Sequence, residues 1–245
     1  MADPILDIQN LTLRYPNAPE PAVRGVSFTL GRERLGIVGE SGSGKSTVGR
    51  AIMRLLPDAT MQADRMNFAG VDLLNASEKH MLKLRGARMS MILQDPKYSL
   101  NPIQRCGDQV AEAYRTHVST TKSEAKAKAI AMLEAVQIRD PERVYDLYPH
   151  EVSGGMGQRI MIAMMLIPEP ELLIADEPTS ALDVSVQAQI IKVLKKLCAN
   201  HGAAVMLITH DMGVIAQTAD RMVVMHQGTV VETGTVGDII RRPQE

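Results

Sequence analysis

The spacing of apolar residues divides the chain into segments of strand-like and helix-like period. Near the N-terminus, residues 6–13 and 26–30 alternate between apolar and polar positions, which predicts two half-buried antiparallel strands. Three later runs are apolar without interruption, as is typical of parallel strands buried on both faces. These runs are residues 35–38, 172–175 and 204–208, the second of them directly after Glu171. Residues 222–225 and 229–231, on either side of Gly228, predict a terminal hairpin.

Helical periods fill the intervals between these strands. Residues 48–56 are apolar at helical spacing, and residues 98–160 are rich in helix formers. Within the second segment, Thr121-Lys122-Ser123-Glu124 is a capping box that predicts a helix start. Ala125, Ala129, Leu133 and Val136 would form the buried face of that helix, and Val186, Ile190, Val193 and Leu197 that of a later one closed near Gly202. Alternating strands and helices indicate an α/β fold with a mostly parallel sheet.

A glycine-rich stretch lies between the first buried run and the helix that follows it. It matches the pattern G-x-x-x-x-G-K-[ST] of a phosphate-binding loop. Glycines let backbone N–H groups turn inward around an anion, Lys45 supplies positive charge to the β- and γ-phosphates, and Ser46 offers a hydroxyl to Mg²⁺. The expected nucleotide-binding residues are Gly39, Glu40, Ser41, Gly42, Ser43, Gly44, Lys45, Ser46 and Thr47.

Two adjacent acidic residues, Asp176 and Glu177, end the second buried run just before Pro178. Open α/β sheets place their ligands at the carboxyl ends of the strands. Beside a phosphate loop, we expect Asp176 to hold Mg²⁺ directly or through water, and Glu177 to accept a proton from the attacking water or to orient it. A structural strand followed by an acidic turn is the alternative, and the accompanying loop favours the catalytic interpretation.

A Ser-Gly-Gly stretch precedes this acidic strand. Ser153 and the two glycines are predicted to start a helix over residues 157–167, whose free N–H groups and positive end would face an anion. Here the chain resembles the ATP-binding cassette (ABC) ATPases, whose signature is Leu-Ser-Gly-Gly-Gln, with Val152 in place of Leu and Met156 in place of Gln. The order of loop, signature and acidic strand is the family's. The resemblance implies that Ser153, Gly154, Gly155 and Met156 act in trans, on the nucleotide of a second subunit.

The resemblance implies roles for four further residues. Gln94 matches the Q-loop glutamine that senses Mg²⁺ and the attacking water, and His210 matches the switch histidine that contacts the γ-phosphate. Asp183 matches the D-loop, which crosses the dimer interface. Tyr15 matches the aromatic residue that stacks on adenine, although a packed residue at a strand end is the alternative. The expected catalytic residues are thus Glu177, His210 and Gln94, and the expected Mg²⁺ ligands are Ser46, Gln94 and Asp176.

The resemblance spans essentially the whole chain and narrows to the peptide and nickel importer branch. Ser99-Leu100-Asn101-Pro102 and Tyr148-Pro149-His150-Glu151 carry this closer match, and Met156 is ordinary in that branch. It implies a P-loop RecA-like core with an N-terminal antiparallel β subdomain and an inserted helical subdomain. We expect a single ABC ATPase domain over residues 1–245, with its core at 1–97 and 161–245 and its helical subdomain at about 98–160.

The same resemblance implies cofactors, partners and a location. The cofactors are ATP and Mg²⁺. The partners are a second ABC ATPase subunit in a homodimer or heterodimer, two transmembrane permease subunits and, indirectly, a periplasmic or extracellular solute-binding protein. The chain would work as a peripheral subunit at the cytoplasmic face of the inner membrane. Its cargo would be a peptide, a nickel chelate or a similar small solute.

Composition limits the other classes of function. A net charge of −1 over 245 residues argues against a broad basic surface for nucleic acid. Cys106 and Cys198 are too few for a disulfide framework or a cysteine metal site. No apolar run approaches the length of a membrane span, and the acidic start at residues 1–4 is unlike a signal peptide.

Two alternatives are a soluble ABC ATPase that remodels a nucleic-acid or ribosome complex, and a regulatory cassette that binds ATP without turnover. The near-neutral charge and the single cassette argue against the first. The presence of Lys45, Glu177 and His210 argues against the second.

Overall fold

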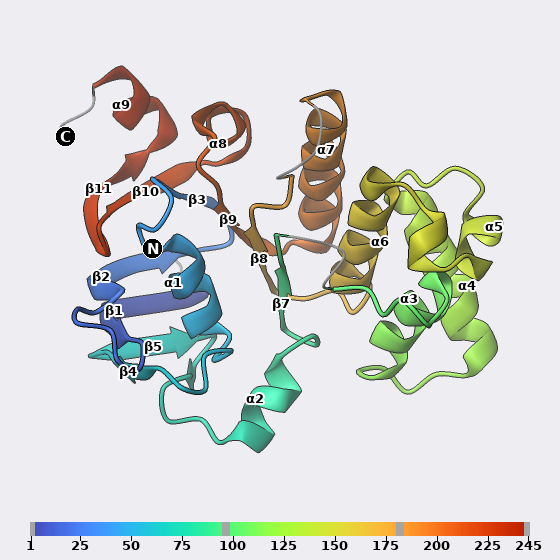
Figure 1. Cartoon of the computed structure of the whole chain (residues 1–245), viewed down its shortest axis with the longest axis horizontal. Coiled ribbons are helices and arrows are strands. Elements are labelled where there is room, and N and C mark those ends of the chain that lie inside the picture. Colours follow the sequence, from blue (N-terminus) through green and yellow to red (C-terminus); the bar gives the residue numbers. More distant parts are fainter. Residues whose placement is uncertain (1–2, 95–98, 180–183, 243–245) are drawn as a thin grey trace. The chain divides into compact units, whose positions relative to one another are not determined.

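The computed structural model of the chain describes residues 3–94, 99–179 and 184–242 (Figure 1). These residues form two compact units. The first contains the described residues of Met1–Arg85, Ile174–Asp176 and Ala204–Glu245, and the second those of Gly86–Leu173 and Glu177–Ala203.

An antiparallel sheet occupies the N-terminal part of the first unit. Its strands are β1 (Leu6–Arg14), β2 (Val23–Leu30), β4 (Thr60–Gln62), β5 (Arg65–Phe68) and β6 (Val71–Asp72), in the order β2-β1-β5-β6, with β4 also paired to β1. Leu6 lies opposite Leu30 and Ile8 opposite Phe28. From Val26 to Leu30, alternate residues of β2 are buried, which confirms the period of two predicted for this stretch.

The second sheet of the first unit is mostly parallel. β3 (Arg34–Gly39) lies between β10 (Arg221–His226) and β9 (Ala204–Ile208) and is parallel to both. β11 (Thr229–Thr235) runs antiparallel along β10, and Gln227 and Gly228 between them have φ values of 44° and 83°. Both values are positive, as a two-residue hairpin turn of type I′ requires, so the predicted hairpin is confirmed.

Buried runs form the strands that carry the expected site. All five residues of β9 and all five of β8 (Leu172–Asp176) are buried, as the uninterrupted apolar runs predict. Residues 174–176 of β8 continue the parallel sheet of the first unit beyond β9. In the second unit, β7 (Met89–Ile92) lies beside the start of β8, where the N–H groups of Glu171 and Leu172 both donate to the carbonyl of Arg88.

The helices of the first unit include α1 (Lys45–Ile52), α2 (Glu78–Leu84), α8 (Met212–Thr218) and α9 (Val236–Arg241). The prediction of a helix up to residue 56 was wrong, because α1 ends at Ile52. Arg54 takes a left-handed conformation with φ 51°, and the N–H of Leu55 reaches back to the carbonyl of Arg50 at 2.9 Å. These contacts form a Schellman motif, which closes a helix.

The second unit is mainly helical. It contains α3 (Cys106–Arg115), α4 (Lys122–Ala135), α5 (Pro141–Asp146), α6 (Gly154–Leu166), α7 (Val184–His201) and the 3₁₀ turn η2 (Pro149–Glu151). The capping box of Thr121 and Glu124 is present at the start of α4, and the four predicted face residues Ala125, Ala129, Leu133 and Val136 are buried. In Figure 1 the helices α3 and α4 pack against α6, and α5 packs against α3 and α4. Among the described residues, no helix is both long and apolar enough to cross a bilayer.

Candidate functional site

The phosphate loop curves around the ammonium group of Lys45. Its Nζ donates to the backbone carbonyls of Gly39 and Glu40, each at 2.7 Å, and lies 3.4 Å from the Ser43 hydroxyl. Lys45 and Ser43 are both buried. The N–H of Gly228, in the β10–β11 hairpin, donates to the Ser43 carbonyl at 3.1 Å and ties the loop to the sheet. A positive charge is therefore held inside the bend of a fixed loop.

Glycines of this loop are required for two reasons. Gly39, Gly42 and Gly44 all have positive φ values, of 150°, 82° and 94°, which disfavour other residues. In addition, a Cβ atom on Gly39 would lie 2.1 Å from the carbonyl oxygen of Met225, and one on Gly44 would lie 2.7 Å from that of Ala22. Two of the glycines thus also permit a close approach of backbone segments.

Helix α1 begins directly after the loop. Gly44 occupies its N-cap position and has no side chain with which to accept a hydrogen bond, and the first turn contains no acidic residue. The N–H groups of the first turn and the positive end of the helix dipole therefore add to the charge of Lys45. This combination of loop, lysine and helix N-terminus suits a phosphate group.

The end of strand β8 meets the first turn of α1. The Ser46 hydroxyl donates to a carboxylate oxygen of Asp176 at 2.7 Å, and Asp176 is only 1% exposed. Both residues belong to the first unit. Hydroxyl and carboxylate oxygens are the ligands that Mg²⁺ prefers, so this pair fits the expected metal.

Tyr15, which directly follows β1, lies near Thr47 at the C-terminal end of the phosphate loop. Its hydroxyl is 3.2 Å from the Thr47 hydroxyl, so two of the expected ATP-binding residues are brought together. The ring is half-buried. Stacking of this ring on adenine stays a prediction.

The segment between β9 and α8 presents His210 at the surface. On either side of it, the Thr209 hydroxyl accepts the Asp211 N–H at 3.1 Å, and the Asp211 carboxylate accepts the N–H groups of Gly213 and Val214 at 2.8 and 3.1 Å. These bonds cap α8 and fix the backbone that carries His210.

The remaining catalytic candidates belong to the second unit. Glu177 directly follows Asp176, is half-buried and has a φ of 49°, while Gln94 follows β7 and is exposed. Their expected roles stay predictions. The D-loop candidate Asp183 lies outside the described residues.

The signature stretch forms the N-terminus of α6. The Ser153 hydroxyl accepts the Met156 N–H at 3.3 Å, as expected for an N-cap, and the helix begins at Gly154, three residues earlier than predicted. A Cβ atom on Gly155 would lie 3.2 Å from a methyl group of Val186 on α7, whereas one on Gly154 would meet nothing within 4 Å. Gly155 therefore packs against α7, and Gly154 leaves open space at the helix start.

Two further polar residues of α6 were missed by the sequence analysis. Gln158 is 1% exposed and Arg159 is 8% exposed, and they directly follow the signature. The Gln158 amide donates to the backbone carbonyl of Pro178, directly after Glu177. The sequence does contain a pattern that could have indicated them, because these two polar residues stand together directly before the apolar run 160–167.

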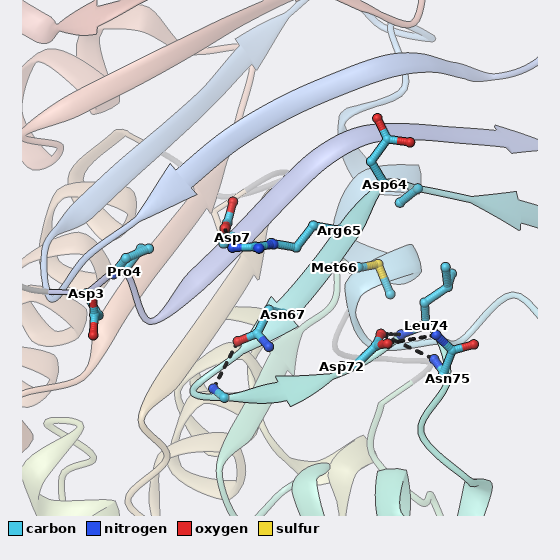
Figure 2. Close-up of a pocket in the computed structure, with 12 residues that line it drawn as sticks. Asp3, Pro4, Asp7, Asp64, Arg65, Met66, Asn67, Asp72, Leu74 and Asn75 are labelled. Atoms are coloured by element: carbon cyan, nitrogen blue, oxygen red, sulfur yellow. Dashed lines mark hydrogen bonds and ion pairs between the residues drawn. The ribbon is translucent and has the colours of Figure 1, made fainter.

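A separate pocket of about 550 Å³ lies on the antiparallel sheet (Figure 2). Two of its acidic side chains have local partners: Asp7 pairs with Arg65 at 3.1 Å, and Asp72 accepts the side-chain amide of Asn75 at 2.7 Å. This last bond lowers the pKa of Asp72 below its usual value. Within the described residues, no group of three or more His, Cys, Asp or Glu side chains could hold a metal ion. The pocket carries none of the predicted site residues.

Comparison with known proteins places the chain in a family. A family model described as ABC transporter matches residues 23–180. The chain is 48% identical over 247 residues to the probable peptide ABC transporter ATP-binding protein y4tR of Sinorhizobium fredii, which covers 99% of this chain and 74% of that protein. It is also 48% identical to the dipeptide transport ATP-binding protein DppD of Bacillus subtilis, over 98% of this chain and 73% of that protein.

Solved structures agree with this assignment. The cbiO1 protein from Clostridium perfringens, part of the ABC transporter complex cbiONQ, superposes with a TM-score of 0.84 at 26% identity, over 98% of this chain and 92% of that one. The dimeric ATP-binding cassette MJ0796 bound to ADP and Pi has a TM-score of 0.83 at 25% identity, over 94% and 98% of the two chains. These similarities confirm the predicted fold class. The chain therefore belongs to the ABC transporter family and is an ATP-binding cassette.

Proposed function

We propose that this chain is the ATP-hydrolysing subunit of an importer for peptides or similar small solutes. The observation that carries the proposal is the 2.7 Å hydrogen bond between Ser46 and Asp176, which joins the phosphate loop to the acidic end of β8. Relatives at 45–48% identity are named as ATP-binding proteins for peptide, dipeptide and oligopeptide transport. These names support an importer rather than an ATPase acting on nucleic acid.

Nucleotide binding would use groups that the loop already orients. Lys45 and the N–H groups at the start of α1 would contact the β- and γ-phosphates. This role is supported by the curvature of the loop around the Lys45 ammonium group and by the start of α1 at Lys45 itself. Tyr15 would stack on adenine, at the side of the loop marked by its contact with Thr47.

Ser46 and Asp176 would hold Mg²⁺, with Gln94 as a third expected ligand. When bound, Mg²⁺ neutralises charge that develops on the phosphate oxygens during transfer. The Ser46–Asp176 contact supports this role because a hydroxyl and a buried carboxylate lie side by side at the N-terminus of α1. Exchange of this hydrogen bond for metal coordination would keep both side chains in place.

Hydrolysis would depend on the residues that follow strands β8 and β9. Glu177 would orient a water molecule and accept its proton as the water oxygen bonds to the γ-phosphorus. The bond from this phosphorus to the bridging oxygen breaks, and ADP leaves with the electron pair. His210, on a backbone fixed by Thr209 and Asp211, would donate a hydrogen bond to the γ-phosphate.

The proposed working form is a dimer of cassettes. The signature residues Ser153, Gly154, Gly155 and Met156 would complete the nucleotide site of the partner subunit, since the N-terminus of α6 favours an anion. Two permease subunits would receive the motion, and a solute-binding protein would supply the cargo. The chain would lie at the cytoplasmic face of the membrane.

Two substitutions test the enzymatic part. Glu177→Gln should bind ATP with unchanged affinity and lose nearly all turnover, because the amide cannot take a proton from water. Lys45→Ala should lose ATP binding. Glu134→Gln, an exposed acid on α4, serves as the matched control and should behave as wild type. Turnover by Glu177→Gln would remove Glu177 from its role, and normal ATP binding by Lys45→Ala would refute the loop assignment.

Co-purification tests the transport part. The full chain would be tagged in its own host and isolated from gently solubilised membranes. Two permeases and a second cassette are the expected partners, and the reconstituted complex should take up peptides only with ATP. Recovery of ribosomes or nucleic acid instead of permeases would refute the importer and leave the ATPase in place.

A further inference from the structure

The backbone of the proposed catalytic residue is strained. Glu177 has a φ of 49°, in the left-handed region that favours glycine. It also precedes Pro178, whose ring disfavours helical conformations of the preceding residue and favours extended ones. Strained conformations of this kind persist only where the surrounding structure holds them.

One buried side chain is placed to hold this strained segment. Pro178 has no N–H group, so its carbonyl is the backbone polar group through which it can be held. The side-chain amide of Gln158 donates a hydrogen bond to that carbonyl, within the second unit. Because Gln158 is 1% exposed and Pro178 is buried, water does not compete with this bond.

The helix that presents Gln158 is itself fixed. The neighbouring Ile160 and Met161 are completely buried. Arg159 donates to the carbonyl of Val136, at the end of α4, and to the side-chain oxygen of Gln189 on α7, both at 2.8 Å. These contacts set the rotation and position of α6, and therefore the position of the Gln158 amide.

We propose that Gln158 is a positioning residue for ATP hydrolysis, which holds Pro178 and thereby keeps Glu177 in its productive conformation. The inference rests on the proposed role of Glu177. Gln158 lies five residues after Ser153, about 7.5 Å along the same helix. The signature end of α6, which would contact the partner's nucleotide, is thus connected through the helix and the Gln158–Pro178 hydrogen bond to the backbone that carries Glu177.

This connection predicts a specific kinetic defect. Gln158→Met keeps the length of the side chain and removes the N–H donor. In the membrane complex of the full chain, kcat per bound ATP should fall by about a hundredfold, the lower end of what a mispositioned catalytic group costs. KM and the Kd for ATP should stay within about twofold, because the phosphate loop is unchanged.

Gln158→Glu gives a readout that a purely structural role would not produce. A carboxylate would face the Pro178 carbonyl without a proton to donate, and burial would raise its pKa. Turnover relative to wild type should therefore be low at pH 8 and rise toward pH 6, where the protonated acid donates an O–H to Pro178. Gln158→Met should show no such recovery.

A matched control separates positioning from loss of packing. Met161→Ala lies on the same helix and removes buried contacts without touching Pro178, so its kcat per bound ATP should equal that of wild type. The proposal is overturned if Gln158→Met keeps the wild-type kcat, or if its kcat falls by no more than the kcat of Met161→Ala. It is also overturned if the turnover of Gln158→Glu shows no pH-dependent recovery. If Glu177→Gln retains turnover, both this inference and the proposed function of Glu177 fail. Loss of turnover in Glu177→Gln with normal Gln158→Met overturns the inference alone.

Discussion

Substitution of the loop glycines by alanine should affect stability in a graded way. Gly39, Gly42 and Gly44 share a positive φ, but their surroundings differ. A Cβ atom would lie 2.1 Å from the Met225 carbonyl oxygen at Gly39 and 2.7 Å from the Ala22 carbonyl oxygen at Gly44, whereas at Gly42 it would meet no atom within 4 Å. We expect the loss of stability to follow the order Gly39, Gly44, Gly42.

Magnitudes can be assigned from two contributions. Alanine at a left-handed position costs about 1–2 kcal/mol, and the lower entropy of the unfolded chain returns about 0.4–1 kcal/mol. Gly42→Ala should therefore destabilise by about 1 kcal/mol. At Gly39 the backbone must also move to relieve the overlap, which adds about 1–3 kcal/mol and brings the total to about 3 kcal/mol.

Thermal unfolding followed by circular dichroism, without nucleotide, measures this difference. For a chain of this length, 1 kcal/mol corresponds to about 2–4 °C in Tm. Gly42→Ala should lower Tm by about 3 °C, Gly39→Ala by about 6–12 °C, and Gly44→Ala by an intermediate amount. Equal shifts for Gly39→Ala and Gly42→Ala would refute the argument from close approach and leave φ as the sole reason for glycine.

Two further predictions concern the second unit. Burial raises the pKa of Cys106 to about 11 and that of Cys198 to about 12. The native chain should therefore resist a thiol reagent at pH 8, whereas both cysteines should react after denaturation. Rapid labelling of the native chain would contradict this prediction. Hydrogen bonds from the Thr121 N–H and hydroxyl lower the pKa of Glu124, so its stabilising effect is complete above the unfolded pKa and is lost as pH falls through the folded pKa. Glu124→Ala should accordingly lower Tm more at pH 7 than at a pH below the folded pKa of Glu124, and an equal shift at both values would contradict the role of the carboxylate in the capping box.

Local sequence patterns determine many of the secondary-structure elements of this protein. The alternation in 26–30, the buried runs in β3, β8 and β9, the capping box of Thr121 and the hairpin at Gly228 all depend on neighbours within a few residues. The phosphate loop is equally local, since glycine spacing and the following lysine suffice to describe it. For such features the sequence contains the whole physical cause.

The apolar pattern alone does not predict where a helix ends. The run that continues to residue 56 is interrupted because Arg54 adopts a left-handed conformation, which is rare for a residue other than glycine. Its side chain donates to the carbonyls of Leu73 and Ala76, far along the chain. A distant contact thus supports a local conformation that propensity disfavours.

Tertiary structure alone decided which chemical groups meet. Ser46 and Asp176 are 130 residues apart, and their 2.7 Å contact exists because β8 joins the sheet whose strand β3 leads into the loop. The sequence likewise indicated Glu177 as an acid after a strand, but not its strained backbone or the hydrogen bond from Gln158 to the neighbouring Pro178 carbonyl. Residue types and short spacings are written in the sequence, whereas contacts across long separations depend on the packing of strands and helices, which no local pattern specifies.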